Sequence, residues 1–363
     1  MSLLTILASI LVFGFVILFH ELGHFFTAKK SGIQVNEFSI GMGPALWKKV
    51  HKGTQYSVRL LPIGGFVSME GEDGEEEEDA ASKEEEAPAP PVPPQQKTGL
   101  PFGEVAIWKR MVVIAAGAVM NLILGYLVML VLIGGDDAIT SKTICEFSEN
   151  ALCQQTGLAE GDTILAVNGR HCFVANDILY ELQRSKNYTA DFTVRRNGQV
   201  VELPGVQFDT VQQNGQTVMQ IGFKVYAVKK TVWNVLREAG SWVLYYMRLV
   251  FMSLADVVTG HVSVNELSGP VGIVSVIGQA VRMGADQLLN LLALLTVNLG
   301  IFNLLPFPAL DGGRLVLLGV EAVIRRPVPQ KVEIAINALG MACLLGLIAF
   351  ATFNDILRLL PGL

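Results

Sequence analysis

Residues 17–28 read ILFHELGHFFTA, a His-Glu-x-x-His pattern inside an apolar run that extends from Leu3 to Ala28. His20 and His24 are four residues apart, so a helix places both imidazoles on one face. Such a pair can bind one metal ion with Glu21 beside it as a general base, the arrangement of zinc hydrolases. The simpler interpretation is a set of polar helix contacts without a metal. Each ionisable group at the centre of a bilayer costs about 2.5–3.5 kcal/mol, so three together favour the metal site.

The composition is that of a membrane protein. Hydrophobic residues make up 51% of the 363 residues and charged residues only 17%, against about 25% charged in soluble domains. The first run has no basic leader and no small-residue cleavage site, so we interpret it as a retained span. We predict a mainly α-helical polytopic membrane protein with four transmembrane helices, within Leu3–Ala28, Met111–Gly135, Leu288–Leu310 and Ile334–Asn354.

The basic residues predict the orientation, because cytoplasmic loops are enriched in lysine and arginine. Basic residues follow the first span, open the second and separate the third from the fourth, whereas Asp136, Asp137 and Asp355 lie on the other side. We therefore expect both termini outside the cytoplasm. The basic residues concerned are Lys29, Lys30, Lys48, Lys49, Lys52, Lys109, Arg110, Arg314, Arg325, Arg326 and Lys331.

The formal net charge of −6 reflects one short stretch. Residues 70–86 hold eleven acidic residues and one lysine, so the rest of the chain has a net charge of +4. The proline-rich residues APAPPVPPQQ follow directly. Such a sequence cannot bury enough apolar surface to order itself. We expect residues 70–104 to form a disordered cytoplasmic loop, with a docking tail for a basic partner as the alternative.

One soluble domain is expected at residues 136–228. VRRNGQVVEL contains Asn197-Gly198, a strong hairpin signal. Residues 156–169, TGLAEGDTILAVNG, resemble the signature of bacterial-type PDZ domains, which bind extended peptides at an open strand edge. A passive spacer or a lid is the alternative. Cys145, Cys153 and Cys172 lie in this domain, and an extracytoplasmic location would permit a Cys145–Cys153 bridge.

Residues 229–285 are predicted to form an interfacial region. The apolar stretch 233–258 is interrupted by charged residues and rich in Trp and Tyr, as in helices that lie at a membrane surface. The stretch SGPVGIVSVIG, at 268–278, is too short and too rich in glycine to span.

A third metal ligand must come from elsewhere in the chain, since a catalytic zinc takes three protein ligands. The segment 298–315, NLGIFNLLPFPALDGGRL, has Asp311 as its one carboxylate, and Pro306 and Pro308 must break the helix ahead of it. A broken helix at membrane depth is tolerated only against protein or a wet cavity. We expect this segment to pack on the first span and to offer Asp311 to the metal; a solvated helix cap is the alternative.

These motifs together resemble the site-2 protease family of intramembrane zinc metalloproteases, of the bacterial regulator-of-sigma-E protease type. HELGH and NLLPFPALDGG match two motifs of that family, and AGAVMN (116–121) is similar to a third, with Ala118 where proline is usual. The resemblance implies that His20, His24 and Asp311 bind Zn²⁺, that Glu21 is the catalytic base, and that Asn298 and Asn303 lie near the site. It covers nearly the whole chain except the acidic stretch.

The resemblance also implies the remaining organisation. Residues 1–69 would hold the first span and a re-entrant β-hairpin-like segment, residues 105–135 the second span, and residues 286–363 the last two. Val58, Leu60 and Val67 would lie on a strand edge, within 56–69, that holds an unwound substrate.

The implied substrates are single-pass membrane proteins, such as anti-sigma factors, or remnant signal peptides, cut in the bacterial cytoplasmic membrane. The inserted α/β PDZ-like domain would lie outside the cytoplasm and exclude bulky substrates. The lipid bilayer is the other expected partner, and no nucleic acid is expected.

Two other classes of protein are compatible with parts of the pattern. A membrane scaffold without catalysis would keep the PDZ-like part but has no need of the metal ligands. A metal transporter would also place His and Asp in spans, but with several polar spans and without a glutamate positioned as a base. Zinc content combined with cleavage of a transmembrane peptide distinguishes all three.

Overall fold

The computed structural model describes residues 2–72, 97–185, 187–213, 216–260, 263 and 268–359. The chain divides into two compact units. The membrane unit comprises Met1–Val128 and Val250–Leu363, and the inserted unit comprises Met129–Leu249. Of residues 70–104, expected to be a disordered loop, 73–96 lie outside the described residues. Residues 97–104 are described and include a short 3-10 helix at Phe102–Glu104, with Phe102 buried.

Five helices in the described part of the chain are long and apolar enough to cross a membrane. Three of them contain predicted spans, and α7 covers residues 288–304 of the third, which was predicted to reach Leu310. The fifth covers the region predicted to be interfacial and is the least apolar. The chain is therefore a multi-pass membrane protein. The five are α1 (Leu3–Ser31), α2 (Ile107–Gly135), α5 (Val232–Val258), α7 (Ala285–Leu304) and α9 (Gln330–Leu359).

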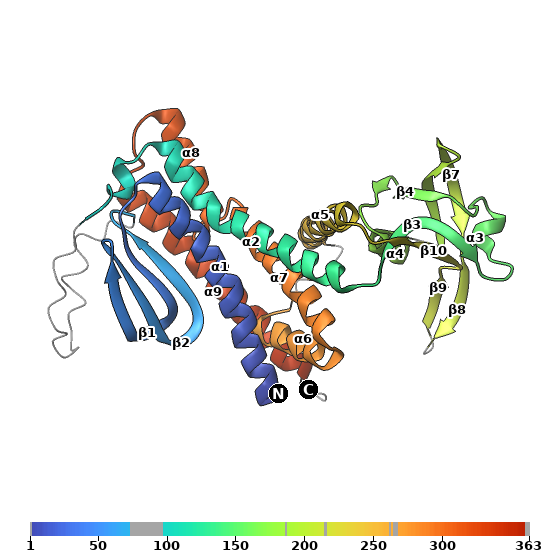
Figure 1. Cartoon of the computed structure of the whole chain (residues 1–363), viewed down its shortest axis with the longest axis horizontal. Helices are drawn as coiled ribbons and strands as arrows, with labels where there is room; N and C mark the ends of the chain where they lie inside the picture. Colours follow the sequence, from blue (N-terminus) through green and yellow to red (C-terminus); the bar gives the residue numbers. More distant parts are fainter. Residues whose placement is uncertain are drawn as a thin grey trace. The chain divides into compact units, whose positions relative to one another are not determined.

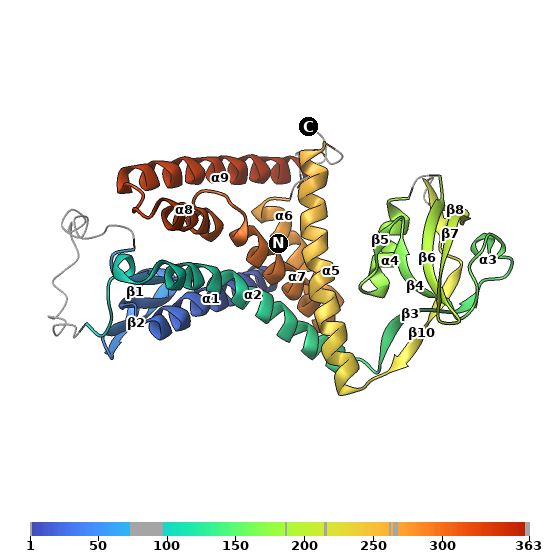
Figure 2. The same cartoon turned by 90° about the horizontal axis from the view of Figure 1, so that it is seen from above.

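Helix α1, which carries the His-Glu-x-x-His pattern, has defined ends. The Ser2 hydroxyl accepts a hydrogen bond from the Thr5 amide at 3.2 Å, and Gly32 closes the last turn with φ 81°, a conformation that favours glycine. The shorter α6 (Pro270–Met283) packs against α1, α7 and α9 (Figures 1 and 2).

The predicted break before Asp311 is confirmed. Helix α7 ends at Leu304, and α8 (Asp311–Ile324) begins after a six-residue connection that contains both prolines. A Cβ on Gly312 would lie 2.0 Å from the Leu305 carbonyl oxygen, and one on Gly313 would lie 2.4 Å from that of Phe307. The two glycines therefore let the chain fold back on itself and present Asp311 at the first turn of α8.

The segment after α1 is a β structure, as the resemblance implied, but it is more folded than one hairpin. Strands β1 (Val35–His51) and β2 (Thr54–Met69) pair antiparallel, and both bend at glycines with positive φ, Gly41 and Gly64 among them. Residues 37–40 consequently pair on both sides, with 55–58 and with 65–68. The last part of β2, residues 65–69, forms an edge of this sheet.

The inserted unit contains a mixed fold of strands and short helices. Its main sheet has the order β10-β3-β4-β6-β7, with β5 paired to β4, and β8 and β9 form a separate hairpin. The predicted Asn197-Gly198 hairpin is confirmed as the β6–β7 turn, in which both residues have positive φ. The elements are β3 (Ala138–Phe147), α3 (Leu152–Gln155), β4 (Thr163–Val167), β5 (Arg170–His171), α4 (Ala175–Gln183), β6 (Thr189–Arg196), β7 (Gln199–Gln207), β8 (Asp209–Gln213), β9 (Gln216–Gln220) and β10 (Phe223–Lys229).

The cysteines contribute to packing in this unit. Cys145, Cys153 and Cys172 are free thiols, so the bridge left open by the sequence is not formed. Cys153 and Cys172 are buried in the core of the unit. Burial raises the pKa of both thiols to about 11, which keeps them in the unreactive protonated form at neutral pH.

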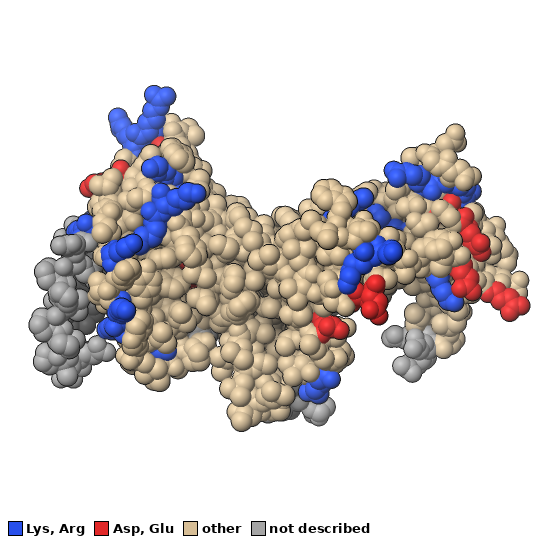
Figure 3. Space-filling model, viewed as in Figure 1, with Lys and Arg blue, Asp and Glu red and all other residues tan. Residues whose placement is uncertain are grey.

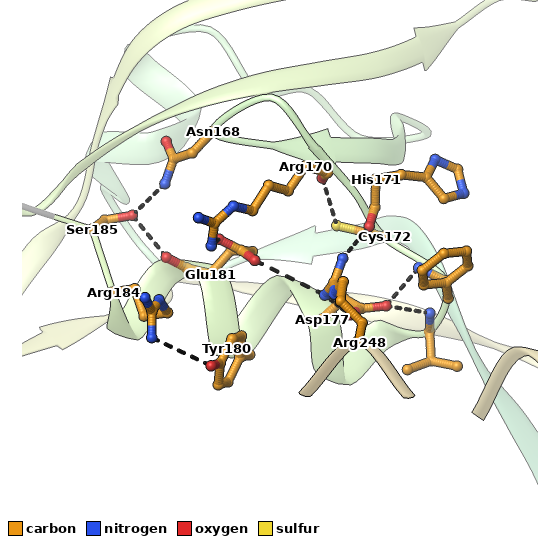
Figure 4. Close-up of polar contacts among 12 residues, drawn as sticks. Asn168, Arg170, His171, Cys172, Asp177, Tyr180, Glu181, Arg184, Ser185 and Arg248 are labelled. Atoms are coloured by element: carbon orange, nitrogen blue, oxygen red, sulfur yellow. Dashed lines mark hydrogen bonds and ion pairs between the residues drawn. The ribbon is translucent and has the colours of Figure 1, made fainter. Parts of the chain in front are cut away.

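A buried ionic cluster ties Arg248, in the second half of α5, to α4 inside the inserted unit (Figure 4). The Arg248 guanidinium pairs with Asp177, whose side chain is fully buried, and donates to the His171 carbonyl oxygen. The second Asp177 oxygen accepts the Val174 amide at 2.9 Å and so caps α4. Removing one member of a buried ion pair costs about 3–5 kcal/mol, so this cluster holds the part of α5 that belongs to the inserted unit against α4.

Candidate metal centre

Three side chains from two distant parts of the sequence meet inside the membrane unit. The Nε2 atoms of His20 and His24 are 3.1 Å apart, and they lie 3.2 Å and 3.3 Å from Asp311 Oδ2. All three side chains are largely buried, with exposed fractions of 10%, 9% and 17%. Helix α1 supplies both histidines at i and i+4, and the first turn of α8 supplies the carboxylate.

This geometry fits a tetrahedral zinc ion. Zn–N and Zn–O bonds of about 2.0–2.1 Å place neighbouring tetrahedral ligands about 3.3 Å apart. The three observed separations are within about 0.2 Å of that value. Asp311 Oδ2 is also buried without a hydrogen-bond donor. A cation bound to this oxygen would explain why no donor is present. Two imidazoles and one carboxylate leave one position open, as catalytic zinc requires.

Helix α2 sets the orientation of the histidines. The His24 Nδ1 atom lies 2.9 Å from the Val113 carbonyl oxygen. That oxygen can only accept, so Nδ1 carries the proton and Nε2 keeps a lone pair for the metal. This is the tautomer that a zinc ligand needs.

Asn121 has the corresponding role for His20. Its side-chain amide lies 3.3 Å from His20 Nδ1, the residue is fully buried, and its Oδ1 has no donor. The two ends of an amide are interchanged by a simple flip. With Oδ1 turned to His20, Nδ1–H donates, the buried oxygen is satisfied, and Nε2 is left for the metal.

Close packing of α1 on α2 depends on two glycines. A Cβ on Gly117 would lie 2.3 Å from His24 Nε2, and one on Gly23 would lie 2.4 Å from the Ala116 carbonyl oxygen. Only glycine at these two positions lets the backbones approach closely enough for Val113 and Asn121 to reach the histidines.

Glu21 lies between the metal ligands and the end of β2. Its carboxylate accepts a hydrogen bond from the Val67 backbone amide. Gly65, two residues earlier, lets β2 approach β1, because a Cβ there would lie 2.6 Å from the Ser39 carbonyl oxygen. Glu21 is not one of the three grouped ligands. Glu21 therefore lies beside the three candidate ligands and contacts the edge of β2.

The other predicted residues are placed differently. Asn303 Nδ2 lies 3.4 Å from His20 Nε2, at the metal centre. Asn298, earlier on α7, is half-buried and forms no hydrogen bond to the three ligands in the described structure. Val58 pairs on both sides, with Ile40 and Trp47, whereas Val67 lies on the edge segment. Leu60 is exposed near the bend of β2.

Two contributors were absent from the predicted site. Asn121 belongs to the AGAVMN stretch noted in the sequence, but only its 3.3 Å approach to His20 shows a role. The Val113 carbonyl could not be found from sequence, since every residue has one. A buried asparagine within a span was the one available signal.

Replacing Asn121 by leucine is expected to lower zinc affinity by about 10–100-fold, the usual cost of losing an outer partner of a ligand. Leucine keeps the volume but cannot fix the His20 tautomer. Chelator titration of the purified protein measures the change.

Thr296→Val is the matched control. Thr296 is buried in the same α2–α7 contact and donates to the Asn121 backbone carbonyl at 3.2 Å, without touching a ligand. Its zinc affinity should stay near that of the wild type. Equal affinity in the two variants would remove Asn121 from the site.

Comparison with known proteins agrees with this centre. The family model described as peptidase family M50 matches residues 8–347. The regulator of sigma-W protease RasP of Bacillus subtilis is 30% identical, with 98% of this chain and 99% of that protein covered. A putative zinc metalloprotease of Clostridium perfringens is 33% identical, with 97% and 98% covered.

A further relative, the zinc metalloprotease RasP of Bacillus licheniformis, is 31% identical over 98% of this chain and 99% of its own length. The resemblance noted in the sequence is thus confirmed, as are the zinc cofactor and the metalloendopeptidase class. The family model matches nearly the whole chain, and two histidines and one aspartate lie at distances that suit a zinc ion. This chain therefore belongs to peptidase family M50, the site-2 proteases.

Proposed function

We propose that this protein hydrolyses peptide bonds within the transmembrane segments of single-pass membrane proteins. The observation that carries the proposal is the position of the metal centre. His20 and His24 lie on α1 and are oriented by α2, and both helices are long and apolar enough to cross a membrane. A substrate must therefore reach the centre from within the bilayer.

The residues of the chain support a hydrolytic mechanism. Bound zinc would polarise the scissile carbonyl and make a water molecule more acidic. Glu21 accepts a proton from the attacking water and then donates it to the leaving amine. Asn303, whose amide group lies at the metal centre, donates to the carbonyl oxygen as negative charge develops on it.

The edge of β2 supports a mode of substrate binding. A transmembrane helix hides its peptide bonds, so it must unwind before it is cut. Residues 65–69 present an edge, and the Val67 amide already points away from β1, toward Glu21. An unwound substrate added to this edge as a strand lies beside the metal ligands. We therefore place substrate binding at Val67 and its neighbours, and not at Val58, which has no open edge.

Val67→Pro is expected to reduce cleavage by about tenfold or more, because proline removes the amide from this edge. Val67→Ala keeps the amide and should cleave within about threefold of the wild type. Turnover of a transmembrane peptide in detergent or nanodiscs measures both, and zinc content should be the same in both.

A change on the substrate side separates strand addition from loss of the Glu21 contact. N-methylation of the substrate at every second residue around the cut should block cleavage, and N-methylation of the alternate residues should not, because strands pair with a period of two. Equal effects of the two patterns would rule out strand addition.

The inserted unit is proposed to be a PDZ-like domain outside the cytoplasm that excludes bulky substrates. In support, β10 is an edge strand of its main sheet, and the 156–169 signature forms β4 with the turns on either side. The targets in this proposal are anti-sigma factors or remnant signal peptides in the bacterial cytoplasmic membrane, after another protease has shortened them. The name of the Bacillus subtilis relative, a regulator of sigma-W protease, agrees with the first class.

Removing residues 139–228 is expected to let the enzyme cut substrates that keep a folded outer domain. Ala138 and Lys229 pair directly in β3 and β10, about 5 Å apart, so a two-residue linker closes the gap. Zinc content and cleavage of the shortened substrate should stay close to wild type. A deletion variant that binds zinc and cuts neither substrate would assign the domain to activation instead.

A further inference from the structure

The membrane unit also contains a pocket of about 530 Å³ between the start of α2 and α8. The chain on either side of the acidic stretch, at Gly71–Glu72 and Phe102–Gly103, completes its wall. The three metal ligands and Glu21 are not among its lining residues. Neither the metal nor the proposed substrate edge accounts for it.

The wall of this pocket has an apolar part and a charged part. One part is apolar and formed by α2 and α8, with Ile107, Ile114, Leu317 and Leu318. The other part carries four arginines and three glutamates, which leave a net positive charge; they are Arg110, Arg314, Arg325, Arg326, Glu72, Glu321 and Glu333.

The ion pairs in the pocket leave cationic groups available. Arg110 pairs with Glu321 at 3.2 Å, and Arg314 pairs with Glu72. The Arg110 Nε atom is nevertheless buried without an acceptor. Arg325 and Arg326 are exposed at the end of α8, and within the described residues neither side chain forms an ion pair. Arg325 and Arg326 are therefore the exposed cationic groups of this pocket that no described ion pair uses.

The pocket lies at an end of the membrane helices. Helix α2 begins at Ile107, and Trp108 next to it is 61% exposed, with the Lys109 ammonium 5.8 Å from its ring centre. Exposed Trp beside lysine is typical of the headgroup level of a bilayer. Figure 3 shows Lys and Arg side chains at the α8 end of this unit and along its β1–β2 side, next to a broad surface with few charges. The arginines consequently face headgroups while the apolar wall faces acyl chains.

We propose that this pocket binds the phosphate of an anionic phospholipid, with an acyl chain along the apolar wall. Arginine donates to phosphate through a planar fork of N–H groups, and basic pockets between membrane helices suit such headgroups. Arg325 and Arg326 supply the donors. A free phosphate ion would use the same donors but would gain nothing from Ile107, Ile114 and Leu317.

Occupancy of the pocket acts on α8 as a whole. The helix has only 14 residues; it begins at Asp311, the metal ligand, and its last turn leads into Arg325 and Arg326. A lipid bound between α8 and α2 restricts the movement of the helix that carries Asp311. Lipid dependence of activity is thus expected, but binding itself is measured without any proteolysis.

Lipid retention by the full-length protein tests the proposal. Native mass spectrometry of protein released from nanodiscs that contain equal phosphatidylglycerol and phosphatidylcholine should show one retained phosphatidylglycerol. The double variant Arg325→Gln, Arg326→Gln should lower retention by about tenfold, since charge-assisted hydrogen bonds are lost. The double variant Lys48→Gln, Lys49→Gln removes the same charge from exposed positions on β1 and should retain the lipid within about twofold.

Each alternative has its own outcome. Unchanged retention in the arginine variant, or equal retention of phosphatidylcholine, would overturn the proposal. Displacement of the lipid by millimolar inorganic phosphate would identify a free-phosphate site instead. Equal melting temperatures of the two double variants in phosphatidylcholine nanodiscs exclude misfolding as the cause of any loss.

Discussion

Glu21→Gln is expected to abolish peptide cleavage and to leave zinc in place. Glutamine keeps the size of the side chain and its contact with the Val67 amide through the amide oxygen, but it cannot accept the proton of an attacking water. Loss of a positioned general base typically lowers the rate by about 10²–10⁴-fold. Turnover of a transmembrane peptide and zinc content by mass spectrometry measure the two effects on one preparation.

The matched control is Glu104→Gln, which changes an exposed carboxylate just ahead of α2. It should cleave at the wild-type rate. Substantial residual turnover in the Glu21 variant, with zinc bound, would show that another group is the base.

Asp311→Asn is expected to weaken zinc binding by more than about 100-fold, beyond the loss from an outer partner. The Asp311 oxygen lies 3.2–3.3 Å from both histidine Nε2 atoms, and a neutral amide is a much poorer zinc ligand than a carboxylate. Activity should fall with occupancy. Chelator competition on the purified variant gives the affinity directly.

Asn337→Ala provides the control for the same connection between α7 and α8. The Asn337 side chain accepts the Ala309 amide at 3.4 Å, so its loss loosens the loop without removing a ligand. Zinc affinity near wild type is expected there. An unchanged affinity in the Asp311 variant would require a different third ligand.

The sequence predicted that His20, His24 and Asp311 meet, because each of the two segments that carry them has a strong local signal. His20 and His24 share a helix face by spacing alone, and a proline pair followed by Asp311-Gly312-Gly313 must end one helix and begin another. Ionisable groups are costly in a bilayer. The few that occur in the spans were therefore expected to lie together, although nearly 290 residues separate them in the sequence.

The parts that sequence could not predict depend on long-range packing. The family resemblance implies a strand within residues 56–69 but not which edge stays open. The bends at Gly41 and Gly64 let Val58 pair on both sides and leave Val67 at the edge. Asn121 needs the close α1–α2 approach, made by Gly23 and Gly117, before it can reach His20. The pairing of Arg248 on α5 with the buried Asp177 likewise joins residues 71 positions apart, which no local pattern indicates.

One measurement tests the central claim most directly. Purified wild-type protein is mixed in a phosphatidylglycerol-containing bilayer with a single-span peptide, and the products are identified by mass spectrometry before chelation, after chelation and after zinc is restored. Two fragments with new termini inside the hydrophobic span, lost on chelation and recovered with zinc, are the result that an intramembrane zinc protease predicts. Intact peptide in all three samples, from protein shown to hold one zinc ion, would contradict it and favour a scaffold or a metal transporter.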